Sequence, residues 1–365
     1  MAAEWVQSLN RNSRRLWNGI INYSPVYNLL GRYANTRRLF ALGRLSGGSW
    51  NTYASHFQNF LQFLSSEQLP LETVTETTLE MYVCYLAEQP GTIKAGTTVA
   101  SHISGIRSCL RELGIILNDA TGTSAALAGY KRFALMVKPA PHQHAAWPLE
   151  HTRLVLRRAR ALLPLFRNGT LDMAGYRTVV GAAHIVLAQL TFSRGHTTNN
   201  VLLSDLDFTD TGFSVVLRSQ KRPQDHLPHQ EHHVSLGRSY RTDPVQFLLD
   251  YVAALRYLRV HPDSRLFPTA KGKGFSLDAA VKHFVALCDL RHSDNAPLTG
   301  HTIRVGSVSA AFSIGVPLPT CAYMCHHKQV SSTQGYIRHG LKIDTDLAFQ
   351  YFGNLRPSTG SGHSV

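Results

Sequence analysis

Apolar side chains recur every three or four residues along several segments of the first third of the chain. That spacing places them on one face of a helix, so each segment is predicted to be a helix that buries one stripe. The stripes are Tyr53, Phe57, Phe60 and Leu64, and then Val99, Ile103, Ile106, Leu110 and Leu113, which Gly114 closes. Thr77 and Glu80 have capping-box spacing before "LEMYVCYLAEQ", and "SAALAGYKRFAL" predicts a fourth helix. Residues 49–136 are therefore predicted to form a compact all-helical domain.

The periodicity fades on both sides of this domain. Residues 137–148, "VKPAPHQHAAWP", are rich in Pro and His and are predicted to be a linker. Residues 1–48 are basic and irregular, and they fit either an arm that contacts DNA or a disordered leader.

From Leu149 onward the pattern mixes helices with a small sheet. Three short runs of strand-forming residues, "DLDF", "GFSVVLRSQ" and "EHHVSL", predict an antiparallel sheet. The helical segments around them are "LEHTRLVLRRARALL", "LDMAGYRTVVGAAHIVLAQLTF", "DPVQFLLDYVAALRYLRV" and "LDAAVKHFVALCDL". The sequence thus predicts a mainly α chain with a second, α+β domain over residues 149–342 and a tail over 343–365.

Composition agrees with two domains and narrows the class of partner. The chain has 365 residues, 44% of them hydrophobic, which is enough for a core in each domain. Lys and Arg number 37 against 23 Asp and Glu, a net charge of +14, and such a field attracts polyanions. A soluble basic protein without a nucleic-acid partner would carry the same charge, so charge alone does not decide.

The cysteines and histidines do not predict a metal site. Cys84, Cys109, Cys288, Cys321 and Cys325 lie mostly in apolar helical segments and are predicted to be reduced core thiols. The run from Cys321 to His327 holds four metal-binding side chains, but zinc sites normally use two separated ligand pairs. The apolar stretch 179–192 is too short to span a membrane and contains His184. With no signal peptide, we expect an intracellular protein without a membrane partner.

Candidate chemistry gathers toward the end of the chain. His301 and Arg304 in "LTGHTIRVG" are three positions apart and share a helix face, which suits two donors aimed at one anion. His327 and Tyr336 follow in "HHKQVSSTQGYIRH". Tyrosine is a nucleophile at neutral pH only with cationic and hydrogen-bonding neighbours, and Arg matches phosphate oxygens. Each residue alone would be ordinary, because H-x-x-R is common on solvated helix faces and tyrosine is usually packing. Their joint spacing predicts covalent phosphoryl transfer.

H-x-x-R, a histidine, and a tyrosine nine residues after that histidine together resemble the catalytic box of the tyrosine recombinases, the phage-integrase superfamily. The resemblance implies an arginine upstream, after a long apolar helix and before a D-x-D strand. Arg194 stands there in "LTFSRGHTTNNVLLSDLDF", with Asp205 and Asp207 at the expected offsets. The segment "GVPLPTCAYMCHHKQVSSTQGYIRH" is similar to the eukaryotic mobile-element branch, the DIRS-like, Ngaro-like and crypton recombinases.

The resemblance also implies a lysine on a β-hairpin that protonates the leaving 5′ oxygen. Lys221 in "RSQKRPQD" is the candidate, and the neighbouring Arg222 is a poor proton donor because its pKa exceeds 12. An ordinary solvated hairpin charge is the alternative for Lys221. One departure stands out, since the family usually has an acidic residue where Thr197 stands. Arg194 would then need another orienting partner, such as a backbone carbonyl or His196.

What the resemblance implies is a recombinase that cuts and rejoins double-stranded DNA through a 3′-phosphotyrosyl link, without a cofactor or metal. Arg194, His301, Arg304 and His327 would act on the phosphate, Tyr336 would attack it, and Lys221 would protonate the leaving group. The family acts as a dimer on each site and a tetramer in the synapse, and its C-terminal helix docks on a neighbouring subunit. Packing of that helix on its own domain is the alternative. The mobile-element branch would imply a nuclear location.

Two other functions remain open at this stage. A type IB topoisomerase or a telomere resolvase would use the same chemistry, and a domesticated DNA-binding protein would use none.

Overall fold

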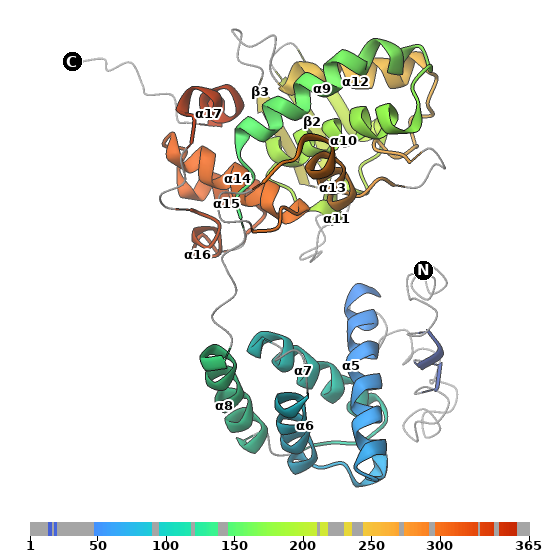
Figure 1. Cartoon of the computed structure of the whole chain (residues 1–365), viewed down its shortest axis with the longest axis vertical. Coiled ribbons are helices and arrows are strands. Elements are labelled where there is room, and N and C mark those ends of the chain that lie inside the picture. Colours follow the sequence, from blue (N-terminus) through green and yellow to red (C-terminus); the bar gives the residue numbers. More distant parts are fainter. Residues whose placement is uncertain are drawn as a thin grey trace, which may run out of the picture. The chain divides into compact units, whose positions relative to one another are not determined.

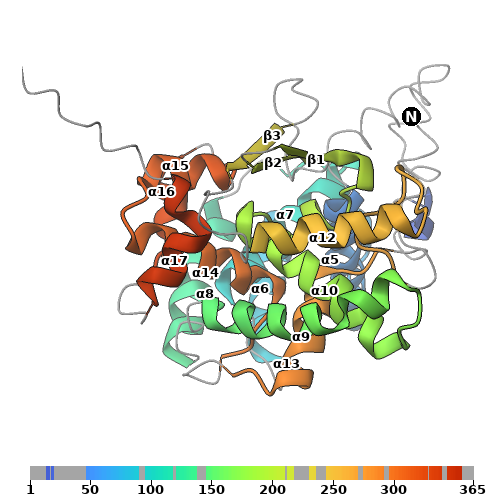
Figure 2. The same cartoon turned by 90° about the horizontal axis from the view of Figure 1, so that it is seen from above.

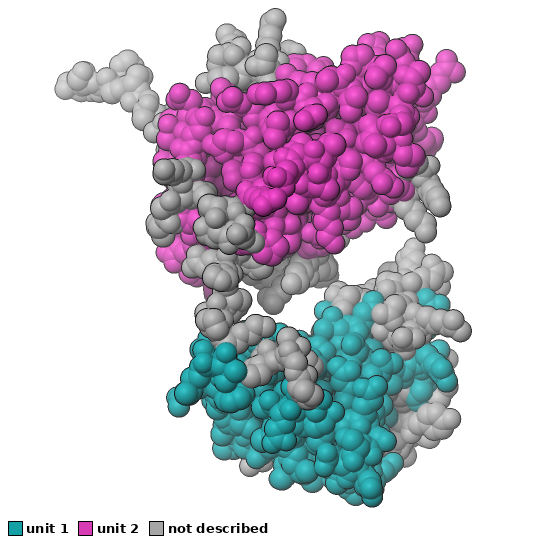
Figure 3. Space-filling model, in the orientation of Figure 1, with its two compact units in different colours: residues 1–141 teal, residues 142–365 magenta. Residues whose placement is uncertain are grey.

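The computed structural model describes residues 14–16, 18–19, 47–89, 95–117, 121–137, 145–209, 212–217, 230–235, 244–269, 274–291, 296–327, 329–338 and 343–355. The chain divides into two compact units, residues 1–141 and residues 142–365 (Figure 3). Most of the described residues are helical, and one small antiparallel sheet lies in the second unit (Figure 1). This confirms the predicted fold class.

The first unit is all-helical in its described part. Its helices are α5 (Gly47–Ser66), α6 (Glu76–Glu88), α7 (Gly96–Glu112) and α8 (Thr121–Val137), with a 3-10 turn at Leu71–Thr73. The predicted stripes on α5 and α7 form its core, with Tyr53 and Leu113 at the margin and the other stripe residues buried. Gly114 ends α7 with a φ of 84°, a left-handed conformation that suits glycine.

The predicted start of α6 is wrong by two residues. Thr75 caps the helix, and its backbone N–H donates to the Thr78 hydroxyl at 3.1 Å while the Thr78 N–H donates back at 3.4 Å. Glu80 does not reach back toward the predicted cap at Thr77. Its carboxylate lies against Gly122 of α8 instead. Several closely spaced threonines could cap the helix, and the packing of Glu80 against α8 favours Thr75.

The second unit is built around α10 (Met173–Leu190). From Thr178 to Leu190 every residue of this helix is buried, as expected for a helix that is apolar on all sides. Four helices pack against it (Figure 1, Figure 2): α9 (Leu149–Arg167), α12 (Pro244–Tyr257), α13 (Leu277–Cys288) and α14 (Gly300–Ser313). None of the described helices is long and apolar enough to cross a membrane.

The sheet has the predicted strands in the order β1 (Leu206–Thr209), β2 (Gly212–Leu217) and β3 (Gln230–Ser235). Both pairings are antiparallel, with Leu206 opposite Val215 and Val215 opposite His232. Lys221 follows β2 and lies outside the described residues.

The C-terminal helix α17 (Thr345–Phe352) packs on α14 within the same chain. Leu347, Ala348, Tyr351 and Phe352 are buried there, as in the cis alternative named above. Docking on a neighbouring subunit stays a prediction.

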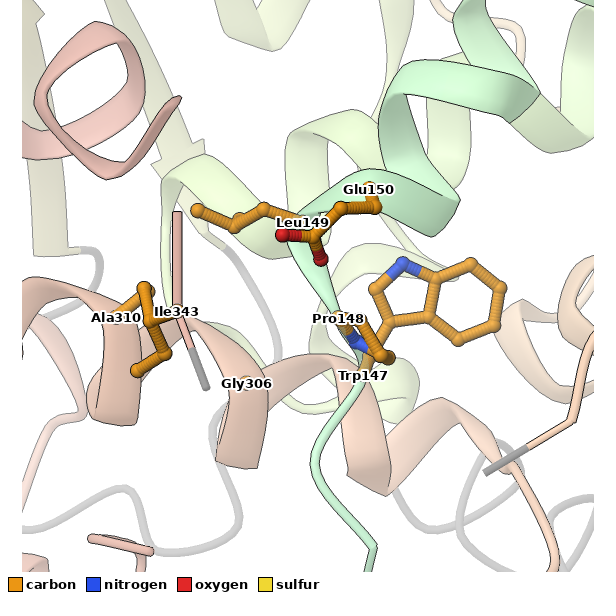
Figure 4. Close-up of a pocket in the computed structure, with 7 residues that line it drawn as sticks. All are labelled: Trp147, Pro148, Leu149, Glu150, Gly306, Ala310 and Ile343. Atoms are coloured by element: carbon orange, nitrogen blue, oxygen red, sulfur yellow. The ribbon is translucent and has the colours of Figure 1, made fainter. Parts of the chain in front are cut away.

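Trp147, inside the segment predicted as a linker, is buried in the second unit with 1% of its surface exposed. Its backbone N–H donates to the Thr302 carbonyl of α14 at 2.9 Å, and its indole N–H donates to Thr152 Oγ1 at 2.8 Å. The backbone of Trp147 passes beside Gly306 of α14, next to a small pocket that Ile343 also lines (Figure 4). The chain therefore enters the second unit directly on the helix that carries His301 and Arg304.

Gly306→Ala should destabilise the second unit, because a Cβ at Gly306 would collide with the Trp147 carbonyl. We expect a loss of about 1–3 kcal/mol in the free energy of unfolding, the usual cost of overpacking. The control is Gly129→Ala in α8, where a Cβ meets nothing within 4 Å. That variant should gain up to about 1 kcal/mol from helix propensity. Urea unfolding curves measure both, and an unchanged Gly306→Ala midpoint would contradict the close approach.

Candidate active site

The N-terminus of α14 positions two of the predicted residues. Thr299 caps the helix in a capping box with Thr302, and the Gly300 N–H donates to Asp278 Oδ1 of α13 at 2.7 Å. His301 lies in the first turn and Arg304 one turn later. The His301 ring centroid is 5.4 Å from that of Tyr336, and the Arg304 Cζ atom is 5.2 Å from the Tyr336 ring centroid. The predicted shared face is thus present, and both side chains lie against the same tyrosine.

His327 is placed by the end of α15 (Leu318–Met324). The helix closes in a Schellman motif, in which the His327 N–H donates to the Ala322 carbonyl at 3.0 Å and the His326 N–H to the Tyr323 carbonyl at 2.9 Å. His326 holds the left-handed position with a φ of 52°, where glycine is more usual. This turn directs the His327 side chain to Arg304.

Arg304 is the best-buried charge of the site, with 1% of its surface exposed. Its Nη2 donates to the Cys325 carbonyl at the C-terminus of α15 and to His327 Nε2 at 2.8 Å. Its guanidinium also lies near the Tyr336 ring. A cation is favourable at a helix C-terminus. Burial lowers the pKa of Arg304, and the charge of Arg194 lowers it further.

His327 is held at both ring nitrogens, with Nδ1 2.8 Å from the Thr333 hydroxyl. Burial lowers the pKa of His327 to about 4, helped by the positive charges of Arg304 and Arg194. The ring is therefore neutral near pH 7. Its centroid lies 5.2 Å from the Tyr336 ring centroid.

The backbone around Tyr336 is anchored to α14 by one serine. Ser309 Oγ donates to the Tyr336 carbonyl at 3.0 Å and accepts the Arg338 N–H at 3.1 Å. The Tyr336 N–H donates to the Thr333 carbonyl of the short helix α16 (Ser331–Gln334) at 2.9 Å. The half-buried Tyr336 ring is thus fixed from both sides of its backbone.

Arg194 follows α10 and caps the short helix α11 (Gly195–Thr198). Two residues earlier, Phe192 is fully buried in a left-handed conformation, with a φ of 52°, and its ring packs edge-on against Phe352 of α17 at 5.2 Å. Left-handed backbone is uncommon for a bulky side chain and costs roughly 1–2 kcal/mol. The buried packing holds this turn in place.

No acidic residue orients Arg194 from the position of Thr197. Thr197 is buried, and its N–H donates to the Arg194 carbonyl at 2.9 Å. Within the described residues, the Arg194 side chain forms no hydrogen bond or ion pair. Helix α11 itself is held by Thr198, whose hydroxyl is 2.8 Å from Nε2 of the buried His184, and by Arg265, which donates to the Asn199 carbonyl at 2.7 Å. These hydrogen bonds hold the turn, whereas the Arg194 guanidinium makes none with the described residues.

The site therefore gathers five of the six predicted residues, namely Arg194, His301, Arg304, His327 and Tyr336. The charges of Arg194 and Arg304 repel each other. In the described part of the chain, neither arginine pairs with a carboxylate that would offset this repulsion. Crowded cations without a counter-ion make a site for an anion. The described residues include no group of three or more His, Cys, Asp or Glu side chains that could hold a metal ion.

Part of the chain is similar to a known protein family. Residues 36–114 match the family described as "Phage integrase, N-terminal SAM-like domain". The fold of the chain is similar to XerH site-specific recombinase bound to palindromic difH substrate in a post-cleavage complex. In that comparison the TM-score is 0.55 and the identity 13%, over 91% of this chain and 88% of that one.

The chain has the tyrosine-recombinase fold. A dimer of lambda integrase (residues 75–356) bound to a COC′ core site also matches, with a TM-score of 0.49 and 12% identity over 86% of this chain and 96% of that one. No curated protein matches the chain in sequence.

Within this tyrosine-recombinase fold, sequence reasoning missed two residues of the site, Ser309 and Thr333. Ser309 lies on α14 among other small residues, and Thr333 lies in a polar run. Nothing in either local pattern distinguishes them from ordinary helix residues, because their partners come from 6 to 29 positions away in the sequence.

Proposed function

We propose that the chain is a site-specific DNA recombinase that cuts and rejoins double-stranded DNA through Tyr336. The observation that carries the proposal is that His301, His327 and Arg304 all lie against Tyr336. The charge of Arg194 also acts on His327. A phosphodiester would supply the anionic partner that Arg194 and Arg304 lack among the described residues.

In the proposed reaction the Tyr336 hydroxyl oxygen attacks phosphorus and its proton passes to solvent water. The bond from phosphorus to the 5′ oxygen breaks, and a 3′-phosphotyrosyl link forms. Arg194, His301 and Arg304 stabilise the charge that builds on the non-bridging oxygens. Lys221, outside the described residues, would protonate the leaving 5′ oxygen. The covalent link keeps the phosphodiester energy, so rejoining to another 5′ hydroxyl needs no nucleotide.

The predicted role of His327 is to donate a hydrogen bond to a non-bridging oxygen, and this role depends on the protonation of its ring. Its Nε2 accepts a hydrogen bond from Arg304 in the unbound site, so it can donate to a phosphate only after gaining a proton. The negative charge of a phosphate would favour that protonation by offsetting the nearby arginines.

Three finer features belong to the same proposal. Strand exchange would need two protein copies on each DNA site and four in the synapse. The segment from Gly315 to His339 supports a place in the eukaryotic mobile-element branch, and a nuclear location with it. Integration, excision or transposition would then be the biological outcome.

The test uses the covalent adduct. The full chain is incubated with a genomic fragment library in excess chelator, and denaturation-resistant protein–DNA adducts are isolated and mapped. We expect adducts at defined positions, linked through Tyr336 to a 3′ phosphate. A need for magnesium would point to another mechanism, and duplex binding without any adduct would indicate a DNA-binding protein that has no recombinase activity.

The mapped site then separates the enzymatic alternatives. Exchange of fragments between two marked duplexes indicates recombination. Relaxation of supercoils without exchange would indicate a topoisomerase, and hairpin ends would indicate a telomere resolvase.

Ser309→Ala should slow adduct formation about tenfold while leaving duplex binding unchanged. The substitution removes two backbone hydrogen bonds that hold Tyr336, each worth about 1 kcal/mol. Ser313→Ala is the control, because among the described residues the Ser313 hydroxyl donates only to the Ala310 carbonyl of its own helix. Equal single-turnover rates for the two variants would show that the anchor does not position the tyrosine.

A further inference from the structure

The two partners of the His327 ring determine which nitrogen carries the proton. The guanidinium of Arg304 can only donate, so Nε2 of His327, 2.8 Å from Arg304 Nη2, must accept. A neutral imidazole has one N–H, and that proton must then be on Nδ1. Nδ1 lies 2.8 Å from the Thr333 hydroxyl, which accepts it.

Thr333 also contacts the nucleophile segment. It has none of its surface exposed, and its N–H donates to the Val330 carbonyl at 2.9 Å. Its carbonyl accepts the Tyr336 N–H at 2.9 Å. One buried residue thus fixes the His327 ring through its side chain and the Tyr336 backbone through its main chain.

We propose that Thr333 is a positioning residue of the active site, which holds the Nδ1 proton of His327 so that Nε2 is the nitrogen that gains and loses a proton. Its catalytic consequence rests on the proposed function, whereas the assignment of the two nitrogens does not.

The consequence follows from the surroundings of Nε2. Among the described residues, Arg304, Arg194 and Tyr336 are charged or titratable groups near Nε2. With the site empty, burial and the charges of the two arginines keep Nε2 unprotonated, and its lone pair orients the Arg304 guanidinium. With a phosphate bound, Nε2 can take a proton from water and donate to a phosphate oxygen. Thr333 accepts the Nδ1 proton in both states, so the ring need not rotate.

The nitrogen assignment can be read by ¹⁵N NMR of the imidazole rings in the full chain without DNA. The His327 signals are identified by their absence in His327→Gln. We expect a protonated Nδ1 and an unprotonated Nε2 at pH 7 in the wild type and in Thr333→Ser, which keeps the hydroxyl. Thr333→Val keeps the shape but removes the acceptor, so the Nδ1 proton loses its hydrogen bond and the Nδ1 signal should shift. A wild-type proton on Nε2, or identical signals in Thr333→Val, would overturn the inference.

Adduct formation then tests the catalytic consequence. Thr333→Val should slow single-turnover cleavage about tenfold or more, since one buried hydrogen bond is lost and the unpaired Nδ1 donor is left behind. Thr333→Ser should restore most of the rate. Equal slowing by both variants would show that Thr333 only fills space. If the wild type forms no adduct on any DNA, the proposed function fails, and the NMR result still decides the role of Thr333.

Discussion

Tyr336→Phe is expected to abolish the covalent protein–DNA adduct. Phenylalanine keeps the ring that packs against His301, His327 and Arg304, so the site should stay assembled. Only the attacking oxygen is removed. Loss of a catalytic nucleophile typically costs a thousandfold or more, so we expect roughly that reduction or a signal below detection. Denaturing gels of a nicked target duplex measure the adduct, and gel-shift titration measures duplex binding, which should be unchanged.

The matched control is Tyr323→Phe. Tyr323 lies on α15 in the same unit with 58% of its surface exposed. This variant should form the adduct as the wild type does. Persistence of the adduct in Tyr336→Phe would exclude Tyr336 as the nucleophile, and loss of the adduct in both variants would mean that the assay reports something other than the active tyrosine.

Arg194→Ala is expected to separate activity from stability. Cleavage should fall about a hundredfold to a thousandfold, the usual effect of losing one donor that stabilises transition-state charge. The free energy of unfolding should stay the same or rise slightly. The side chain makes no hydrogen bond or ion pair with the described residues. Its charge repels that of Arg304 and disfavours protonation of His327. Removing it should also raise the pKa of His327 from about 4.

Single-turnover cleavage, thermal unfolding and NMR titration of His327 measure these three effects. Arg153→Ala on the exposed side of α9 removes the same charge far along the chain from the site residues and should leave all three unchanged. A destabilised Arg194→Ala would show that Arg194 is part of the structural framework. A normal cleavage rate would remove it from the mechanism.

Much of the fold follows from periodicity along the sequence. The stripes on α5 and α7 and the apolar run of α10 specify which surfaces are buried, because burial of apolar area dominates the choice. The start of α6 did not follow, because the capping choice between Thr75 and Thr77 depends on where Glu80 packs in three dimensions. The burial of Trp147 could not be predicted for a similar reason. Its Pro- and His-rich surroundings are typical of a linker, whereas its partner Thr302 lies 155 positions away.

The candidate site shows the same division. Spacing and chemistry together indicated the residues whose types are specialised, such as Arg304 and Tyr336. The supporting residues Ser309 and Thr333 are small and common. Their role can be recognised only when folding brings them against His327 and the Tyr336 backbone. A sequence pattern carries little information about contacts of that kind.

The edge-on packing of Phe352 against Phe192 also bears on when the site is completed during synthesis of the chain. The core of the first unit is complete once Ala134 has been made, so that unit can fold while the ribosome is still translating the second. The turn that carries Arg194 gains its Phe352 neighbour only about 160 residues later, after Tyr336 has been added. A chain released between Arg304 and Tyr336 would keep the first unit and both arginines but would lack the tyrosine. Under the proposed mechanism such a fragment cannot cut DNA, so cutting activity requires synthesis to pass Tyr336.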